Sequence, residues 1–315
     1  MAEWLYEAGI GEARAALIED GLIVEARIER EGSGARAGDV LPARLKHKAG
    51  RAGRAEIAFD DGATALLSPV PPGLTEGGPL LAEIVREAIP ERGNPKLPLA
   101  RPSEGPARLA PSLAEGIAPA RMLHPHEPDA LEAAGWSELL EQAETGLVPF
   151  PGGLLRIALT PAMTVIDVDG DLPPAELAIR GAQASAAAIR RLGIGGSIGI
   201  DLPTVPDKRA RQAAAEAFDL AYPQPFERTA VNGFGFLQII RRRVRPSLPE
   251  LIQSDPVRAA ALALLRRLER EPLPGPDSAS VSPAIAHLIA DHPHWLETLA
   301  RRRGRPIQIL SALSG

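Results

Sequence analysis

The 315-residue sequence contains no cysteine and few aromatic residues, which make up 3% of the chain. The lack of cysteine excludes disulfides, thiolate zinc sites and cysteine nucleophiles, and it fits a reducing cytoplasm. With so few aromatic side chains but 45% hydrophobic residues, we expect a core of Ala, Leu, Val and Ile. The 30 glycines and 32 prolines predict many loops.

The chain also lacks long hydrophobic runs, a basic net charge and a visible secretory start. No segment approaches the roughly 18 apolar residues of a membrane-spanning helix, so no membrane partner is expected. The opening residues, MAEWLYEAGIGEARAALIED, show no basic segment followed by an apolar one, and we expect a cytoplasmic location. Because the net charge is −5, a polyanionic partner would have to meet a local basic patch.

Changes in composition predict five segments along the chain. Residues 1–35 alternate apolar and polar side chains around a hairpin turn, Glu-Asp-Gly. Residues 36–102 contain short strands between Gly/Pro turns, which is typical of a small barrel. Residues 103–146 form a proline-rich, acidic connecting region without a strong core. Strand and helix patterns alternate over 147–250, and 251–315 holds helices and a closing strand.

The segment 147–250 places two aspartates at the ends of apolar strand-like runs. Asp167 follows MTVI, Asp201 ends SIGID, and the helical pattern of 174–192 lies between them. The separation of 34 residues (201 − 167) fits a strand–helix–strand unit. Such a crossover makes the two strands parallel, so both carboxylates would lie at the same edge of the sheet. Asp169, two residues after Asp167, would share its face.

Converging carboxylates of this kind are hard oxygen ligands, which suit Mg²⁺ or Mn²⁺. A metal ion there would activate water and stabilise the charge on a phosphodiester. The alternative is that these aspartates are solvated turn or cap residues at strand ends. Spacing alone favours neither interpretation.

A basic surface is predicted on the barrel segment. Its cationic residues, opposed only by Asp39, are Arg36, Arg44, Lys46, Lys48, Arg51 and Arg54. If Phe59 were exposed beside them, cations would bind phosphates and the ring would stack on a base. The alternative is a solvated face with Phe59 in the barrel core, which its alternation in phase with Ile57 favours.

A second basic run, Arg241-Arg242-Arg243-Val244-Arg245, follows the aspartates in the chain. It would either hold phosphates near the acidic crevice or form the exposed end of a helix. The sequence supports the two interpretations equally.

Three blocks within residues 147–248 resemble the catalytic region of the ribonuclease E/G family. LVPFPGGLLRIALTPAMTVIDVDG is similar to the family's LPSGG…ALTAIDVNSG, and IRRLGIGGSIGIDL is similar to LRLRDLGGLIVIDF. FERTAVNGFGFLQIIRRRVRPSL is similar to SRFGLLEMSRQRLRPSL. The order and spacing of the blocks also agree.

The resemblance implies an α/β fold with an RNase H-like/DNase I-like catalytic core in 147–250. It implies an inserted S1-type OB-fold barrel in 36–102 and a small C-terminal α/β domain in 251–315, with the strands of 1–35 packing on the core. The implied activity is that of a metal-dependent endoribonuclease that cleaves single-stranded RNA with Mg²⁺, or with Mn²⁺, in RNA processing or decay.

Site residues follow from the same resemblance. Asp167 and Asp201 match the family's metal-binding aspartates, and Asp169 stands where an asparagine usually orients the metal ligands. Phe59 matches an aromatic residue that packs on RNA, and Lys96 lies near a basic residue of that surface. The RNA-binding residues expected in this chain are Phe59, Arg44, Lys46, Lys48, Lys96, Arg241, Arg242 and Arg243.

The chain also departs from the family pattern. Its short 103–146 region implies that the 5′-end sensor is largely deleted, and without cysteine neither zinc nor a zinc-linked tetramer is expected. Gly233 stands where the family has an arginine before Phe-Gly, and Asp169 adds a charge that would strengthen metal binding or raise a neighbour's pKa. These departures support an alternative, an RNA-binding protein of the same fold with weak or lost nuclease activity. A weaker alternative is a phosphodiesterase acting on DNA or a small nucleotide.

Overall fold

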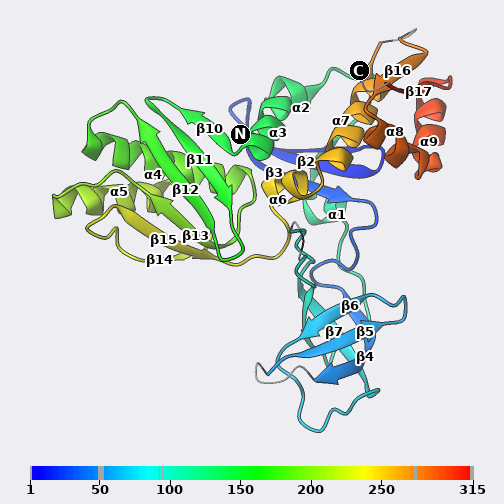
Figure 1. Cartoon of the computed structure of the whole chain (residues 1–315), viewed down its shortest axis with the longest axis horizontal. Helices are drawn as coiled ribbons and strands as arrows, with labels where there is room; N and C mark the ends of the chain where they lie inside the picture. Colours follow the sequence, from blue (N-terminus) through cyan, green and yellow to red (C-terminus); the bar gives the residue numbers. More distant parts are fainter. Residues whose placement is uncertain (1, 49–52, 92, 94, 273–274, 313–315) are drawn as a thin grey trace.

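The structure, a computed structural model, describes residues 2–48, 53–91, 93, 95–272 and 275–312. Within these ranges the chain forms a closed five-stranded barrel and sheets of four, six and two strands, with helices packed beside them (Figure 1). The expected α/β class with a small barrel is therefore confirmed. No helix in the described part is long and apolar enough to cross a membrane.

The four-stranded sheet lies at the centre of the molecule and has the order β3-β2-β1-β9 (Figure 1). Its strands are β1 (Glu3–Ala8), β2 (Glu12–Glu19), β3 (Leu22–Arg30) and β9 (Ala120–Leu123). β2 and β3 pair around Asp20 and Gly21, whose φ angles are 51° and 81°. Two residues with positive φ favour a tight hairpin turn, so the hairpin expected at this position is confirmed.

The barrel closes in the order β4-β5-β6-β8-β7. Its strands are β4 (Val40–Lys48), β5 (Ala55–Phe59), β6 (Thr64–Leu67), β7 (Pro79–Arg86) and β8 (Leu99–Pro102). Alternate residues point inward and form a separate apolar core that includes Leu45, Ile57, Leu67 and Ile84. The chain enters and leaves at one place, because Val40 and Arg108 exchange two backbone hydrogen bonds. Figure 1 shows the barrel projecting away from the other layers.

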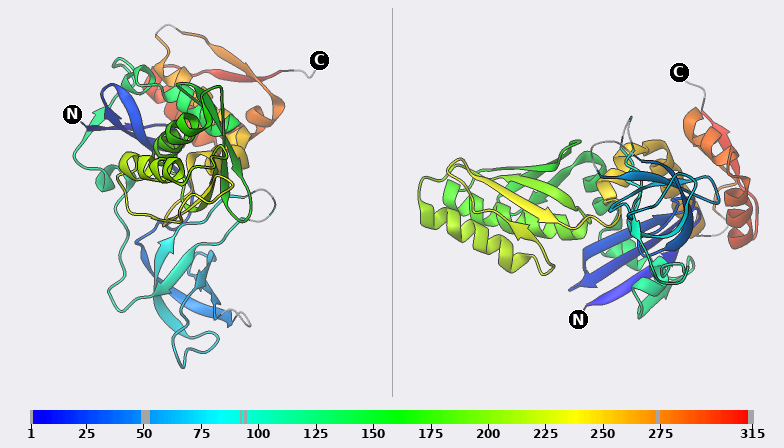
Figure 2. Two further views of the ribbon diagram at one scale, coloured as in Figure 1. Left: turned by 90° about the vertical axis from the view of Figure 1, so that its left-hand side faces the viewer. Right: turned by 90° about the horizontal axis from the view of Figure 1, so that it is seen from below.

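The six-stranded sheet has the order β10-β11-β12-β13-β15-β14. Its strands are β10 (Leu147–Phe150), β11 (Gly153–Leu159), β12 (Thr164–Gly170), β13 (Gly196–Asp201), β14 (Glu227–Arg228) and β15 (Phe236–Arg241). Two amphipathic helices, α4 (Pro174–Arg191) and α5 (Lys208–Ala221), lie along one face of this sheet (Figure 2). They bury residues that alternate along the strands, among them Ile166, Ile198 and Ile200.

The connecting region contributes to the main core, contrary to expectation. It contains α1 (Leu113–Gly116), α2 (Ala130–Ala133) and α3 (Trp136–Thr145). Leu131, Trp136 and Leu139 are at most 2% exposed and belong to the same apolar cluster as the six-stranded sheet. Short helices can bury a few large side chains without the long periodic pattern that announces a core in the sequence.

The C-terminal part packs against the central sheet through helices. It contains α6 (Leu248–Ser254), α7 (Pro256–Arg270), α8 (Pro283–Ala290) and α9 (Pro293–Arg303), with a parallel pair of strands, β16 (Ser278–Val281) and β17 (Gln308–Ser311). β16 lies between α7 and α8 in the chain. Its residues Ala279 and Val281 pack on the small apolar core between α7 and α9.

Candidate metal and nucleic-acid site

The two aspartates singled out by the sequence are direct neighbours in the six-stranded sheet. β12 and β13 are parallel, as the 34-residue spacing predicts, and Asp167 is the register partner of Asp201. Arg156 on β11 pairs with Asp167, and Phe236 on β15 pairs with Asp201. Because paired residues project from the same face, Arg156, Asp167, Asp201 and Phe236 form one row across four strands.

This row lies on the face of the sheet that α4 and α5 leave uncovered. Ile166 and Val168, which flank Asp167 in the chain, are buried on the helix side. Asp201 is exposed and Asp167 is half-buried. Asp167 does not end its strand, because β12 continues to Gly170 by pairing with β11. The carboxylates therefore sit on a sheet surface that is open to a ligand.

Like charges and partial burial act on Asp167. Partial burial, followed by the charges of Asp169 and Asp201, raises the pKa of Asp167 above its usual value of 3.8, while Arg156 opposes this rise. Asp169 is half-exposed and accepts a hydrogen bond from Arg156 Nε at 2.8 Å. An aspartate at 169 was expected either to strengthen metal binding or to raise the pKa of a neighbour. The second effect is the one that acts on Asp167.

The donor set at this row suits a hard divalent cation. Within the described ranges no group of three or more His, Asp or Glu side chains is arranged to hold a metal ion. Mg²⁺ commonly takes only one or two protein carboxylates and fills its other positions with water and phosphate oxygens. Asp167 and Asp201 supply two adjacent carboxylates, and Asp169 would be a third only after leaving Arg156. The residues present therefore fit Mg²⁺ or Mn²⁺.

A turn formed by residues 232–235 adjoins the same edge of the sheet. Leu202 N–H, one residue after Asp201, donates to Gly235 O at 3.2 Å. Phe234 on this turn is 82% exposed. The Phe236 ring lies over Gly199, where a Cβ atom would approach it to 2.5 Å. Both phenylalanines lie in the Gly-Phe-Gly-Phe stretch of residues 233–236, where the sequence pattern predicts no role for either ring.

Phe59 does not lie on an RNA-binding surface. It is 8% exposed and packs in the barrel core with Ile57 and Leu67. The stacking role suggested by the resemblance is therefore wrong for this placement, and the core interpretation is correct. The cause is strand alternation, which turns Phe59 inward together with Ile57.

Several predicted basic residues of the barrel are engaged within the chain. Arg44 donates to Gly77 O at 3.2 Å, and Lys46 pairs with Glu56 at 2.9 Å. Lys96 pairs with Glu91 at 2.5 Å and also donates to Pro161 O in the turn between β11 and β12. The Lys48 side chain and Arg51 lie outside the described residues.

The arginine run begins at the last residue of β15, and its members differ in their contacts. Arg241 donates to Ile194 O at 2.7 Å and to Gln224 Oε1 at 2.5 Å. Arg243 forms an ion pair with Glu250, and burial lowers the pKa of Arg243. Arg242 is exposed, and no ion pair or hydrogen bond to its side chain occurs among the described residues. The run is not an exposed helix end, since residues 242–245 form no helix. Arg242 is available to a phosphate.

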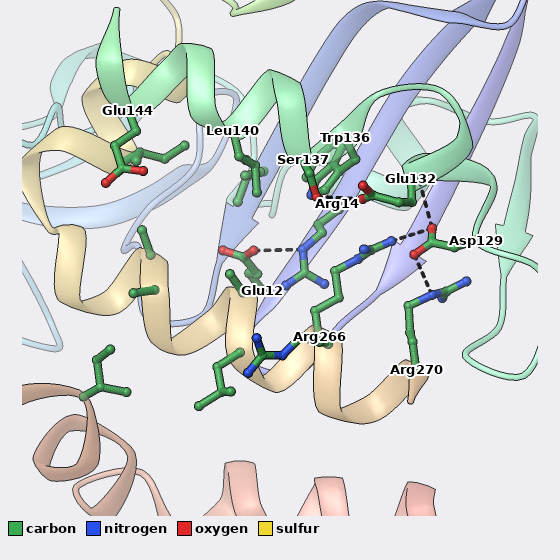
Figure 3. Close-up of a pocket in the computed structure, with 18 of the residues that line it drawn as sticks. Glu12, Arg14, Asp129, Glu132, Trp136, Ser137, Leu140, Glu144, Arg266 and Arg270 are labelled. Atoms are coloured by element: carbon green, nitrogen blue, oxygen red, sulfur yellow. Dashed lines mark hydrogen bonds and ion pairs between the residues drawn. The ribbon is translucent and has the colours of Figure 1, made fainter. Parts of the chain in front are cut away.

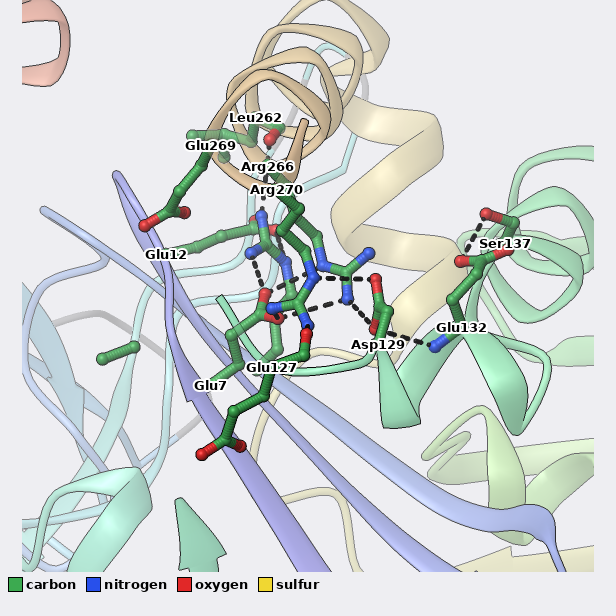
Figure 4. Close-up of polar contacts among 12 residues, drawn as sticks. Glu7, Glu12, Glu127, Asp129, Glu132, Ser137, Leu262, Arg266, Glu269 and Arg270 are labelled. Carbon is green, nitrogen blue, oxygen red and sulfur yellow. Dashed lines mark hydrogen bonds and ion pairs between the residues drawn. The ribbon is translucent and has the colours of Figure 1, made fainter. Parts of the chain in front are cut away.

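A separate pocket lies between the central sheet, α3 and α7 (Figure 3). Several of its polar side chains pair with one another or with the buried Glu7 behind them. Glu7 accepts hydrogen bonds from Arg14, Arg266 and Arg270, and Asp129 accepts from Arg266 (Figure 4). This network ties α7 to β1 and β2, so its arginines serve the packing of the molecule.

The structure thus brings together Asp167 and Asp201 on an open face, with Asp169 beside them. The predicted RNA-binding residues are scattered over the barrel and the end of β15. Among the described side chains of that set, Arg242 is the exposed one that forms no hydrogen bond or ion pair within the chain. Comparison with protein-family models gives no match to this chain, and no curated protein matches it.

Proposed function

We propose that this protein is a metal-dependent endoribonuclease that cleaves single-stranded RNA in the cytoplasm, in RNA processing or decay. The observation that carries the proposal is the register pairing of Asp167 with Asp201 on an uncovered sheet face. The three sequence blocks that resemble the ribonuclease E/G family support it. In this proposal the six-stranded sheet is the RNase H-like/DNase I-like core, and the closed barrel is an inserted S1-type OB-fold.

Asp167 and Asp201 would hold the metal ion. When bound, Mg²⁺ or Mn²⁺ supplies Lewis acidity for a phosphodiester and lowers the pKa of water. Without a cation, the negative charges of Asp167, Asp169 and Asp201 together would repel a phosphate. Arg156 balances part of this charge and holds Asp169 to one side at 2.8 Å. A cation between Asp167 and Asp201 would also relieve the repulsion that raises the pKa of Asp167.

The test is cleavage of a fluorescent single-stranded RNA with and without Mg²⁺. Asp167→Asn and Asp201→Asn are expected to abolish Mg²⁺-dependent product while RNA binding survives. Asp171→Asn is the matched control, because Asp171 is an exposed carboxylate just beyond the row. Mg²⁺ should also raise the melting temperature of the wild type and not that of Asp201→Asn, since only a site present in the folded chain stabilises it. Equal cleavage by the wild type and both row variants would remove the proposal.

The second candidate is an RNA-binding protein of the same fold with weak or lost cleavage. Glycine at position 233 and the engagement of Asp169 by Arg156 favour it. RNA binding without Mg²⁺-stimulated product would support this candidate. Competition between RNA and DNA oligomers addresses the third alternative, a phosphodiesterase acting on DNA or a small nucleotide.

A further inference from the structure

Phe234 is an aromatic side chain left in solvent. Of the six phenylalanines, all of which lie in described ranges, Phe234 alone is exposed, at 82%. Aromatic rings bury a large apolar area when they find a partner, so an isolated exposed ring is a candidate contact for a ligand. Its position matters because the turn that carries it adjoins the end of β13, where Asp201 lies.

The backbone of this turn is held firmly. Asn232 Oδ1 accepts hydrogen bonds from the N–H groups of Phe234 and Phe236, at 2.9 and 3.0 Å. Thr204 Oγ1 donates to Phe234 O at 3.2 Å. Gly235 has φ = 93°, and a Cβ atom there would lie 2.1 Å from Leu202 O, so only glycine allows this close approach. The ring is thus presented from a fixed backbone, which lowers the entropy lost when a ligand stacks on it.

A second ring follows Phe234 in the chain, and two exposed cations follow Asp201. Phe236 lies in the same row as Asp201 and packs over Gly199. Lys208 and Arg209 are exposed at the start of α5, seven and eight residues after Asp201. In the part of the chain that the structure describes, neither side chain forms an ion pair. Exposed aromatic rings are typical of surfaces that bind single-stranded nucleic acid, where bases stack on them. Lys208 and Arg209 are the exposed cations that come next in the chain after Asp201.

We propose that Phe234, flanked by Phe236, forms a subsite that stacks on one unpaired nucleobase next to the Asp167–Asp201 pair. The inference rests on the proposed function for its choice of RNA as the ligand. Bases in a duplex offer their faces only to neighbouring bases, so a stacking ring at this position would select unpaired nucleotides. The base held there would fix the position of the adjoining phosphodiester relative to the two carboxylates.

The experiment measures binding separately from cleavage. Fluorescence anisotropy with a fluorescein-labelled single-stranded RNA decamer in EDTA gives the Kd without turnover. Phe234→Ala is expected to raise the Kd about 5- to 150-fold, which corresponds to the roughly 1–3 kcal/mol lost when a stacking aromatic is removed. Phe234→Tyr, which keeps the ring, should stay within about 2-fold of the wild type. Leu220→Ala is the control, because Leu220 is 89% exposed yet lies at the far end of α5.

Decamers with a single abasic position identify the contact. At the position that meets the ring, the wild type should lose as much affinity as Phe234→Ala loses on intact RNA, and the variant should lose nothing further. An unchanged Kd for Phe234→Ala, or a loss that no abasic position removes, would overturn the subsite.

A parallel cleavage assay with Asp201→Asn separates this inference from the proposed function. Phe234-dependent binding by a protein that never cleaves would contradict the endoribonuclease and leave the subsite standing. Asp201-dependent cleavage that Phe234→Ala leaves intact, with an unchanged Kd, would contradict the subsite alone. Failure of the wild type to bind any RNA decamer would also overturn the subsite.

Discussion

At the scale of single residues, the row across the six-stranded sheet combines groups that oppose one another. Asp167 is half-buried between Asp201 on β13 and Arg156 on β11. The folded chain therefore holds an ionised carboxyl in a setting that favours its neutral form. Such an arrangement lowers stability in the absence of a ligand, which is common at binding sites.

This opposition predicts a pH-dependent gain in stability for Asp167→Asn. The folded-state pKa of Asp167 is raised above 3.8, so the ionised carboxyl disfavours folding at every pH above that raised value. The variant should therefore melt at a higher temperature than the wild type at pH 7. The gain should shrink as the pH falls through the raised pKa and vanish below about 3, where the carboxyl is protonated in both folded and unfolded chains. Melting curves from pH 3 to 7 in EDTA measure this, and a gain independent of pH would contradict it.

At the scale of elements, the contact between α4 and β12 holds the row in place. Gly181 of α4 meets Val168, the residue between Asp167 and Asp169, and a Cβ atom at 181 would lie 2.3 Å from Val168 Cγ1. Val168 is β-branched and stiff in its strand, so a larger residue at 181 must push the helix away from β12.

Gly181→Ala is therefore expected to destabilise the fold by about 1–3 kcal/mol, as overpacking does, although alanine favours helix by about 1 kcal/mol. Denaturant unfolding measures the change. Combining it with Val168→Ala should lose less than the sum of the single variants, because the second change removes the clash. Gly116→Ala in α1 is the control, since nothing lies within 4 Å of its Cβ position. A stabilised Gly181→Ala variant would show that the helix accommodates the methyl group.

The ion network between β1, β2 and α7 gives a second prediction at this scale. Glu7 is 3% exposed and accepts hydrogen bonds from Arg14 and Arg266, both at 2.8 Å, and from Arg270 at 2.9 Å. Glu7→Gln leaves these buried guanidinium groups short of negative charge, and breaking a buried pair in this way costs about 3–5 kcal/mol. Glu3→Gln, an exposed position on the same strand, should change the free energy of unfolding by less than about 0.5 kcal/mol. Equal small effects of the two variants would mean that water reaches the network.

Local pattern predicted the elements but not their lateral order. The 34-residue spacing predicted the parallel pair that joins Asp167 to Asp201, and the helical pattern of 174–192 predicted α4. The antiparallel pairing of β15 with β13 depends on long-range contacts. The local sequence of either strand therefore could not predict that Phe236 lies beside Asp201. Trp136 was missed for a related reason, since its burial depends on how the connecting region folds back onto the main core.

At the scale of the whole molecule, the barrel is an insertion with its own core. Its apolar cluster is separate from the main cluster, and its ends meet where Val40 and Arg108 exchange backbone hydrogen bonds. Its contacts to the other layers include hydrogen bonds. They include the hydrogen bond from Glu87 N to Val244 O at 2.8 Å and the one from Lys96 Nζ to Pro161 O at 3.3 Å.

This separation predicts that the chain tolerates removal of the barrel. Residues 41–107 are replaced by Asn-Gly, a two-residue turn that suits the antiparallel bridge between Val40 and Arg108. The shortened chain should unfold cooperatively with a lower melting temperature, and a fragment spanning 36–110 should fold alone, because each part keeps its own core.

If the barrel's cations contact phosphates, the shortened chain should also show a shallower fall of RNA affinity with salt, since fewer counterions are released on binding. The Mg²⁺-induced rise in melting temperature should persist, because Asp167 and Asp201 lie on a sheet that the deletion leaves whole. Loss of cooperative unfolding in both parts would show that the barrel and the remaining layers stabilise each other.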